Sequence, residues 1–166
     1  VGTLRELGHG VSVVPIGSNL AELTASLESR KPDMVFNLTE HLAGDRRMDK
    51  NIAAFLEMLD VPFTGTGAIG LMLCRDKGLC KQLLRLHKIR VPGFVSILPG
   101  RAIRPPRSVR YPLVVKPALE DGSEGISNAS MVCDDASFSE RVRFVHDNWH
   151  QPAIAEEYIE GRELYI

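Results

Sequence analysis

Apolar positions in the first half of the chain follow two periods. Residues 11–16 and 34–38 are short apolar runs bounded by turn residues, a pattern typical of strands. Residues 20–30 carry leucines three and four positions apart, and residues 48–60 repeat this helical spacing with Met48, Ile52, Phe55, Leu56 and Leu59. Alternating strands and helices predict an α/β fold, with a Rossmann-like parallel-sheet domain over residues 1–75. Because the chain opens in a helical pattern, we expect the first strand of that sheet to be missing.

The second half has a different pattern. Asp76 is placed to cap a helix that ends near His87, and a second helix follows Asp134 or Asp135 with Phe138, Val142, Val145 and Trp149 on one face. Strands are predicted near residues 94–98, 113–116, 131–133 and 152–159. Long connections separate these strands, so the pattern predicts an α+β domain over residues 76–166, with a boundary near Leu73–Asp76.

One of these strands ends at a lysine. An apolar run, Leu113-Val-Val115, leads directly to Lys116, and the following loop carries Gly122 and Gly125. A cation beside a glycine-containing loop suits a phosphate, which needs positive charge and close approach of backbone N–H groups. The alternative, an ordinary strand that ends at a surface lysine, stays open on this stretch alone.

Two other features point towards a nucleotide. Lys77 lies in the first turn of its helix, an unfavourable place for a cation, which indicates an anionic partner. Glu156 and Glu157 end the last strand, and carboxylates accept hydrogen bonds from ribose hydroxyls or from groups around an adenine amine. The sequence contains no G-x-x-x-x-G-K-[ST] motif, so any nucleotide site is not a P-loop.

Two features of the first half remain ambiguous. Gly65, Gly67 and Gly70 satisfy the G-x-G-x-x-G fingerprint of dinucleotide sites, but no acidic residue follows about 20 positions later, so these glycines are interpreted as shaping a turn and a helix entry. Glu40 and His41 follow the 34–38 run, where α/β proteins place ligands. They are candidates to face a substrate, and the alternative is that both are solvated loop residues.

Composition and charge narrow the class of partner. The net charge of −1 favours neither a nucleic acid nor an anionic membrane as partner, and no apolar run approaches the length of about 18 residues that spans a membrane. No signal peptide opens the sequence. The three cysteines, Cys74, Cys80 and Cys133, have no metal-ligand spacing, which is typical of reduced cysteines in a cytoplasmic protein.

Several motifs, in this order, resemble those of a known family. They are Val35-Phe-Asn-Leu38, Val61-Pro-Phe-Thr-Gly-Thr-Gly67, Asp76-Lys77, Val114-Val-Lys-Pro117, Glu120-Asp-Gly-Ser-Glu-Gly-Ile126 and Glu156-Glu-Tyr-Ile-Glu-Gly-Arg-Glu163. Together they resemble ATP-grasp ligases, and within these the D-alanine–D-alanine ligase group. The likeness covers residues 32–166. It implies a substrate (pre-ATP-grasp) domain followed by an incomplete ATP-grasp domain.

The resemblance implies a role for each matched residue. Lys77 and Lys116 match the lysines that contact the phosphates of ATP. The segment with Glu120, Gly122, Ser123 and Gly125 matches the mobile loop that closes over those phosphates. Glu156, Glu157, Tyr158 and Ile159 match the strand that holds adenine, with Glu163 as the acid on the ribose hydroxyls. Glu40 and His41 match positions that border the substrate cleft.

The sequence also departs from the family pattern. Many D-alanine ligases have Gly-Ser-Ser in the mobile loop, where this chain has Asp121-Gly122-Ser123, so the specificity for a dipeptide product is open. The Mg²⁺ ligands of the family, and an arginine at the reacting phosphate, are expected beyond Ile166. No residue within the chain is assigned to a metal.

The function expected from this resemblance is an ATP-dependent carboxylate–amine ligase that forms an amide through an acylphosphate. The implied context is cytoplasmic peptidoglycan biosynthesis with small amino-acid substrates, and a homodimer stays open. A nucleotide-binding module without catalysis is one alternative. An NAD-dependent oxidoreductase, based on the Gly65–Gly70 fingerprint, is the other.

Overall fold

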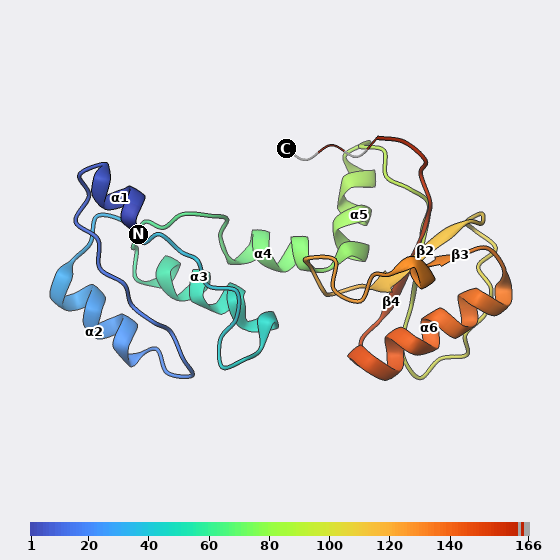
Figure 1. Ribbon diagram of the computed structural model, residues 1–166, viewed down its shortest axis with the longest axis horizontal. Coiled ribbons are helices and arrows are strands. Elements are labelled where there is room, and N and C mark those ends of the chain that lie inside the picture. Colours follow the sequence, from blue (N-terminus) through green and yellow to red (C-terminus); the bar gives the residue numbers. More distant parts are fainter. Residues whose placement is uncertain (163, 165–166) are drawn as a thin grey trace. The chain divides into compact units, whose positions relative to one another are not determined.

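The computed structural model describes residues 1–162 and 164 (Figure 1). The chain divides into two compact units, Val1–Met72 and Leu73–Ile166, and each is described by itself. The assignment of a substrate role to the first domain and a nucleotide role to the second stays a prediction.

Helices dominate the first unit. They are α1 (Gly2–Glu6), α2 (Ala21–Arg30), the 3₁₀ turn η1 (Arg46–Met48), α3 (Asp49–Met58) and the start of α4 (Ala68–Arg75). The side chain of Asn19 accepts a hydrogen bond from the backbone N–H of Ala21 at 2.9 Å, which satisfies one of the free donors at the start of α2. Leucines and isoleucines of α2 and α3 form the buried core, which consists of Leu23, Leu27, Ile52 and Leu56.

The parallel sheet predicted for the first unit is reduced to one bridge. Val35 pairs with Phe63 in the parallel sense: its N–H donates to the carbonyl of Pro62 at 2.8 Å, and its carbonyl accepts from the N–H of Thr64 at 2.9 Å. The described residues therefore do not show a Rossmann-like sheet. The strand prediction for residues 11–16 is wrong, because a strand needs a hydrogen-bonded neighbour and no described backbone group pairs with this segment.

The second unit contains a four-stranded sheet. Its strands are β1 (Phe94–Ile97), β2 (Leu113–Pro117), β3 (Met131–Val132) and β4 (Ala153–Glu157), in the order β1-β4-β2-β3. Every neighbouring pair is antiparallel. Two helices, α5 (Lys77–Leu86) and α6 (Asp135–Trp149), and the 3₁₀ turn η2 (Asn128–Ser130) complete it. The prediction of a mixed α and β fold is confirmed for this unit.

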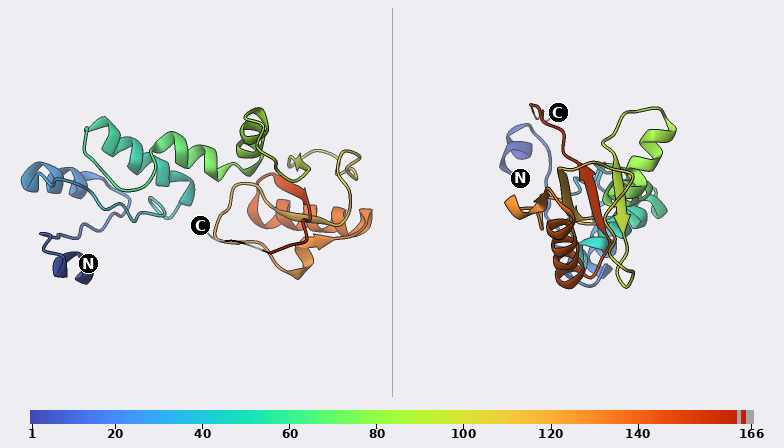
Figure 2. Two further views of the ribbon diagram at one scale, coloured as in Figure 1. Left: turned by 90° about the horizontal axis from the view of Figure 1, so that it is seen from above. Right: turned by 90° about the vertical axis from the view of Figure 1, so that its right-hand side faces the viewer.

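The two faces of the sheet carry different residues. Leu113, Val115 and Ala155 point towards α6 and are buried there against Phe138 and other apolar residues. Successive side chains of a strand point to opposite faces, so Lys116 and Glu156 point to the other side, where α5 lies. The right-hand view in Figure 2 shows α5 and α6 on opposite sides of the strands. The alternation along β2 and β4 thus separates an apolar core from a charged face.

Hydrogen bonds at the N-cap residue fix where α6 begins. Asp134 precedes the helix, and its carboxylate accepts a hydrogen bond from the N–H of Ser137 at 2.8 Å, while the Ser137 hydroxyl accepts one from the N–H of Asp134 at 3.3 Å. This reciprocal pair is a capping box, which satisfies two backbone donors at once. These hydrogen bonds also hold the pKa of the Asp134 carboxyl below its ordinary value.

Candidate functional site

A carboxylate lies between two lysines on the α5 face of the sheet. Glu156 on β4 contacts Lys116 on β2, with 3.1 Å between Oε2 and Nζ, and its Oε1 lies 3.5 Å from Nζ of Lys81 on α5. All three side chains are largely buried, at 10%, 20% and 16% exposed. The register explains the first contact, because Lys116 pairs with Ile154 and Glu156 is two residues further along the same face. The structure therefore brings together two predicted residues, Lys116 and Glu156.

Lys77 joins this cluster from the start of α5. Asp76 caps the helix by accepting a hydrogen bond from the N–H of Leu79 at 2.9 Å, and the ammonium group of Lys77 donates to the carbonyl of Glu120. Burial lowers the pKa of Lys77, and the charge of nearby Lys116 lowers it further. Like charges held near each other in partial burial favour an anion that neutralises both.

Lys81 is a member of the cluster that the sequence prediction missed. It lies four residues after Lys77 on α5, and residues four apart share a face of a helix. That spacing was the signal available in the sequence. Lys81 contacts Glu156 directly, so it belongs to the charged face, and its position makes it a residue that holds the Glu156 carboxylate in place.

The cluster has the composition of a phosphate site with an acceptor beside it. Lys77, Lys81 and Lys116 supply three ammonium groups. Of the neighbouring carboxylates, Glu120 accepts a hydrogen bond from the side chain of Gln151 at 2.7 Å and Asp121 pairs with Arg75 at 3.6 Å. Glu156 contacts Lys81 and Lys116, and its buried Oε1 has no hydrogen-bond donor among the described residues, although the Lys81 ammonium lies 3.5 Å from it. A ligand that brings phosphates and an N–H donor fits this arrangement.

The loop after β2 is anchored at both ends and exposed between them. Glu120 is held by Lys77 and Gln151. Gly125 has φ +72°, and a Cβ there would lie 2.7 Å from Pro117 and 2.9 Å from Trp149, so this glycine is required by packing. Arg141 donates a hydrogen bond to the Gly125 carbonyl, which closes the anchor.

The tip of this loop holds the predicted phosphate donors. Gly122 and Ser123 both adopt positive φ, +57° and +62°, and both are exposed. Two hydrogen bonds shape the tip: the N–H of Glu124 donates to Asp121 and that of Ile126 donates to Ser123. The N–H groups of Gly122 and Ser123 have no acceptor among the described residues. Their role as phosphate donors stays a prediction.

The end of β4 separates the two predicted glutamates. Glu156 points to the lysines, whereas the Glu157 carboxylate accepts the N–H of Arg110 at 2.9 Å and lies beside Gly93. Glu157 therefore holds the connection before β2, outside the lysine cluster. The N–H of Tyr158 donates to the carbonyl of Pro112 at 3.0 Å, and the side chains of Tyr158 and Ile159 are exposed. Glu163, the predicted ribose acid, lies outside the described residues.

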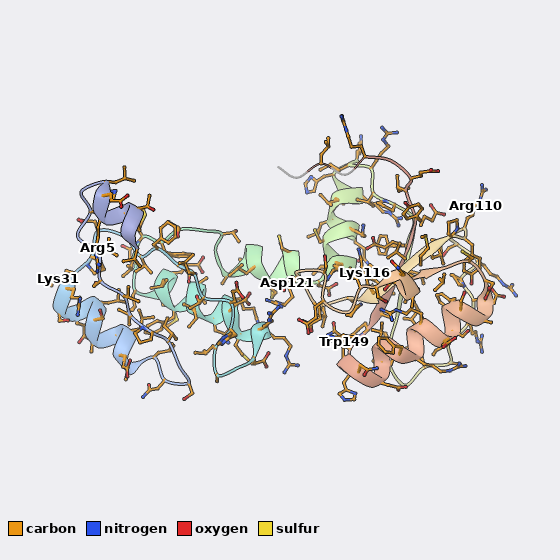
Figure 3. All side chains as sticks on the ribbon, in the orientation of Figure 1. Arg5, Lys31, Arg110, Lys116, Asp121 and Trp149 are labelled. Atoms are coloured by element: carbon orange, nitrogen blue, oxygen red, sulfur yellow. The ribbon has the colours of Figure 1, made fainter. Side chains whose placement is uncertain are left out.

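Figure 3 shows the labelled members of this region. Lys116 lies on the α5 side of the sheet, and Trp149 lies at the end of α6. Asp121 marks the exposed loop that follows β2.

The glycines of the G-x-G-x-x-G motif in the first unit are explained by backbone conformation and close packing. Gly65 has φ +100°, a Cβ on Gly67 would meet the Glu57 carboxylate, and a Cβ on Gly70 would meet the Thr66 hydroxyl. The Glu57 carboxylate accepts the N–H of Ala68 at 3.2 Å, at the start of α4. A dinucleotide would place its pyrophosphate at this kind of helix start, and here a side chain of the chain occupies it. This arrangement supports the interpretation as a turn and a helix entry.

The other predicted site residues, Glu40 and His41, belong to the first unit. Glu40 and His41 are both exposed, in the loop after Val35. In the part of the chain that the structure describes, no group of three or more His, Cys, Asp or Glu residues is arranged to hold a metal ion. No described helix is long and apolar enough to cross a membrane.

Comparison of the sequence with known proteins identifies relatives along its whole length. It is 35% identical to an uncharacterized protein of Sinorhizobium fredii over 100% of this chain and 49% of the relative. It is 33% identical to a D-alanine–D-alanine ligase of Gluconobacter oxydans over 99% of this chain and 52% of that protein. A D-alanine–D-alanine ligase of Syntrophotalea carbinolica is 31% identical, with 98% and 50% covered. No protein-family model matches the chain.

Solved structures agree at the level of the fold. The D-alanine–D-alanine ligase of Bacillus anthracis, in a structure complexed with ATP, aligns with a TM-score of 0.64 and 24% identity over 82% of this chain and 45% of that chain. The ligase of Coxiella burnetii aligns with a TM-score of 0.60 and 25% identity over 78% and 36%. This chain thus spans about half the length of the curated relatives that it matches. The mixed α/β structure, with its four-stranded antiparallel sheet, therefore matches part of the fold of these ligases.

Proposed function

We propose, from the similarity of this chain to D-alanine–D-alanine ligases along almost its whole length, that the protein is an ATP-dependent ligase that joins a carboxylate to an amine. The single observation that carries the proposal is the cluster of Lys77, Lys116 and Glu156 on the α5 face of the sheet, because the motif resemblance assigns these residues to ATP. Sequence relatives supply the reaction class, and the cluster supplies a place for ATP.

The reaction proceeds through an activated carboxylate. A carboxylate oxygen attacks the γ-phosphorus of ATP, the bond from that phosphorus to the bridging oxygen breaks, and ADP leaves. The amine nitrogen of the second substrate then attacks the acyl carbon, phosphate leaves, and the nitrogen loses a proton to give an amide. ATP is required because a carboxylate is a poor acyl donor until it carries a leaving group.

Residues of this chain bind and orient the nucleotide in this proposal. Lys77 and Lys116 neutralise phosphate charge, and their ammonium groups act where solvent is partly excluded. Glu156 accepts an N–H of the base with Oε1, which has no hydrogen-bond donor among the described residues and lies 3.5 Å from the Lys81 ammonium. The exposed tip at Gly122 and Ser123 donates backbone N–H groups when it closes over the phosphates. Magnesium would add charge neutralisation at the phosphates, and no residue of this chain is assigned to it.

D-Alanine is the substrate that the relatives support, because two of those compared are D-alanine–D-alanine ligases. Gly122 stands where many such ligases have a serine, so the activity test below decides which dipeptide is formed. A cytoplasmic location, a part in peptidoglycan biosynthesis and a homodimer belong to the same proposal. The Rossmann-like architecture of the first domain also belongs to it, supported by the parallel sense of the Val35–Phe63 bridge.

Binding of ATP is the first test. Lys116→Ala in the full-length protein removes a charged donor, so we expect ATP to bind about 10- to 100-fold more weakly by calorimetry. Lys31→Ala is the matched control, because Lys31 is exposed in the first unit, and its affinity should equal that of the wild type. Equal affinities of wild type and Lys116→Ala contradict the assignment of this site.

Catalysis is the second test. Full-length protein with ATP, Mg²⁺ and D-alanine should release phosphate and form an amide-linked dipeptide, which mass spectrometry detects. ATP binding without phosphate release, with any pair of amino acids, supports the alternative of a nucleotide-binding module. Tighter binding of NAD than of ATP contradicts the ligase proposal and supports the oxidoreductase.

A further inference from the structure

The connection from β1 to β2 has a three-residue period of charge and burial. Arginines recur at every third position, and all four are exposed: Arg101, Arg104, Arg107 and Arg110. Two residues after each of the first three, an apolar residue faces inwards: Ile103, Pro106 and Val109. Ile103 packs against the core and Val109 is only 8% exposed, so the inner side of this segment is attached to the α6 face. We call residues 101–110 the arginine ladder.

Proline gives the ladder its extended backbone. Residues 101–110 contain no helix and no strand, and residues 102–106 run without a bend. Pro105 and Pro106 hold their own φ near that of a polyproline II helix, and a proline pushes the preceding residue towards the same region. A polyproline II segment has three residues per turn and rises about 3.1 Å per residue, so in this conformation Arg101, Arg104 and Arg107 would follow one side at a spacing of about 9 Å. Bends at residue 101 and at residues 107–109 bound the straight part, and Arg110 lies beyond it.

The guanidinium groups of the ladder have no acceptor among residues 1–162 and 164. None of the four takes part in an ion pair or a side-chain hydrogen bond there, although the backbone N–H of Arg110 is held by Glu157. Other arginines of the second unit do have partners: Arg141 donates to Gly125 and Ser130, and Arg85 stacks on Phe94. In Figure 3, the labelled Arg110 points away from the sheet. The ladder therefore presents four guanidinium groups that have no acceptor among the described residues, on a backbone that is held in place.

The chemistry of the ladder selects among anionic partners. All four cations are arginine, and the planar guanidinium suits bidentate pairing with a carboxylate, whereas lysine would serve equally well for diffuse attraction to a surface. The prolines lack N–H groups, so a partner strand cannot extend a sheet along residues 105–106. No aromatic residue stands among residues 101–110 to stack on the bases of a single-stranded nucleic acid, and the net charge of −1 does not favour a duplex.

We propose that the arginine ladder is a docking surface for an extended acidic segment of a partner protein, whose carboxylates recur every third residue. Each carboxylate accepts two hydrogen bonds from one guanidinium group. A partner in the polyproline II conformation has the same repeat as the straight part of the ladder, so its acidic side chains meet Arg101, Arg104 and Arg107. This interaction is separate from the ATP site, because it uses the connection between strands and none of the lysines.

Fluorescence anisotropy with a defined probe tests the proposal. The probe is a fluorescein-labelled peptide of four Glu-Pro-Pro repeats, and the control peptide has Gln in place of Glu. We expect the full chain to bind the Glu peptide and not the Gln peptide, with affinity that falls as salt is added. The double variant R104Q/R107Q should bind roughly 2- to 30-fold more weakly, since an exposed ion pair contributes about 0.2–1 kcal/mol and two pairs are lost.

Two matched variants make the result specific. R5Q/R30Q removes the same charge from exposed arginines of the first unit and should leave peptide binding unchanged. R104K/R107K keeps the charge and removes the fork, and it should lose most of the affinity that R104Q/R107Q loses. Circular dichroism should show that all variants are folded, because the substituted side chains are exposed.

Three outcomes overturn the proposal. The first is equal binding of the Glu peptide by wild type and R104Q/R107Q. The second is full retention of binding by R104K/R107K, which indicates attraction to charge alone. The third is stronger binding to oligothymidine, or to vesicles that contain phosphatidylglycerol, than to the Glu peptide, which assigns the ladder to a nucleic acid or to a membrane instead.

Discussion

The two units contain similar proportions of apolar residues. They differ in how far their apolar runs are paired and buried as strands. In the second unit, β2 is paired on both sides and its alternate residues are buried at 0% exposure, as Leu113 and Val115 show. In the first unit, the segment 34–38 has one bridge, and its alternate residues Met34, Phe36 and Leu38 are 56–78% exposed. An apolar run becomes a strand where neighbours satisfy its backbone and cover its faces.

The comparison also explains where charge is placed. The second unit has a closed apolar face under α6, so its other face can hold Lys116 and Glu156 in partial burial. The ion pair described in the first unit, Arg47 with Asp45, lies at the surface, and the Arg47 side chain is 68% exposed. A functional charge cluster needs a rigid support, and of the two units the second provides it.

The largest expected effect concerns the cores. Phe138 is fully buried in the second unit, whereas Phe36 in the first is 56% exposed. Phe138→Ala should lower the free energy of unfolding of the second unit by about 3–5 kcal/mol, because it leaves a cavity. Phe36→Ala should change stability by about 0.5 kcal/mol or less. Urea denaturation measures both, and equal losses would show that Phe36 has a packing partner.

The next effect concerns the charge cluster. Glu156→Gln leaves Lys81 and Lys116 partly buried without their carboxylate, which should cost about 2–4 kcal/mol of stability. Glu28→Gln on exposed α2 of the first unit is the matched change and should be close to neutral. The same denaturation experiment applies. If Glu156→Gln is neutral, the ion pairs do not hold the cluster.

A smaller difference in stability is expected between substitutions at the anchored end and at the exposed tip of the loop after β2. Gly125→Ala combines positive φ with contacts to Pro117 and Trp149 that are too short, so we expect a loss of about 2 kcal/mol. Gly122→Ala has positive φ but open space around it and should cost about 1 kcal/mol. Thermal unfolding distinguishes the two. Gly122→Ala, and not Gly125→Ala, should also weaken ATP binding, because the tip is where the proposed phosphate donors lie.

The smallest effect is a difference in pH dependence between the units. Hydrogen bonds from Arg47 lower the pKa of Asp45 from 3.8 to about 2, so this group stabilises the first unit above pH 3.8 and its contribution is lost as the pH falls towards 2. Burial and the hydrogen bond to Asp135 raise the pKa of Tyr111 from 10.0 to about 12. Its contribution to the second unit is present below pH 10.0 and is lost as the pH rises towards 12.

Denaturation across pH checks this difference. Asp45→Asn should flatten the acid side of the profile and Tyr111→Phe the alkaline side. A Tyr111 that titrates near its ordinary value in an ultraviolet absorbance titration would contradict the expected alkaline behaviour. If the acid side of the stability profile is the same in Asp45→Asn as in the wild type, the expected acid behaviour is contradicted.

Particular residues show how far sequence reasoning reached. The helix capped by Asp76, the helix with Phe138 on its inner face and the strand that ends near Lys116 were all predicted, because caps and periodicity are local signals. The strand at residues 11–16 was predicted and is wrong. Its apolar pattern is real, but the partner that would turn the pattern into a strand is not among the described residues.

The candidate site also contains residues that the sequence predicted and residues that only the structure assigned. Lys77, Lys116 and Glu156 were predicted and the structure brings them together, while Lys81 was missed and Glu157 lies outside the cluster. Nothing in the sequence distinguishes Glu156 from Glu157, because the two are adjacent. Only the strand register, which sends successive side chains to opposite faces, assigns one to the lysines and the other to the Arg110 backbone.

By itself, the amino-acid sequence determined the helices and their caps, the order of the motifs and the resemblance to ATP-grasp ligases, since these depend on residues close together in the chain or on their order along it. The tertiary structure alone decided which strands form, which of two neighbouring glutamates meets the lysines, and that Gly125 is a packing requirement. Those outcomes depend on contacts between residues far apart in the sequence, such as Lys116 with Glu156 and Gly125 with Trp149. Local patterns do not encode such contacts.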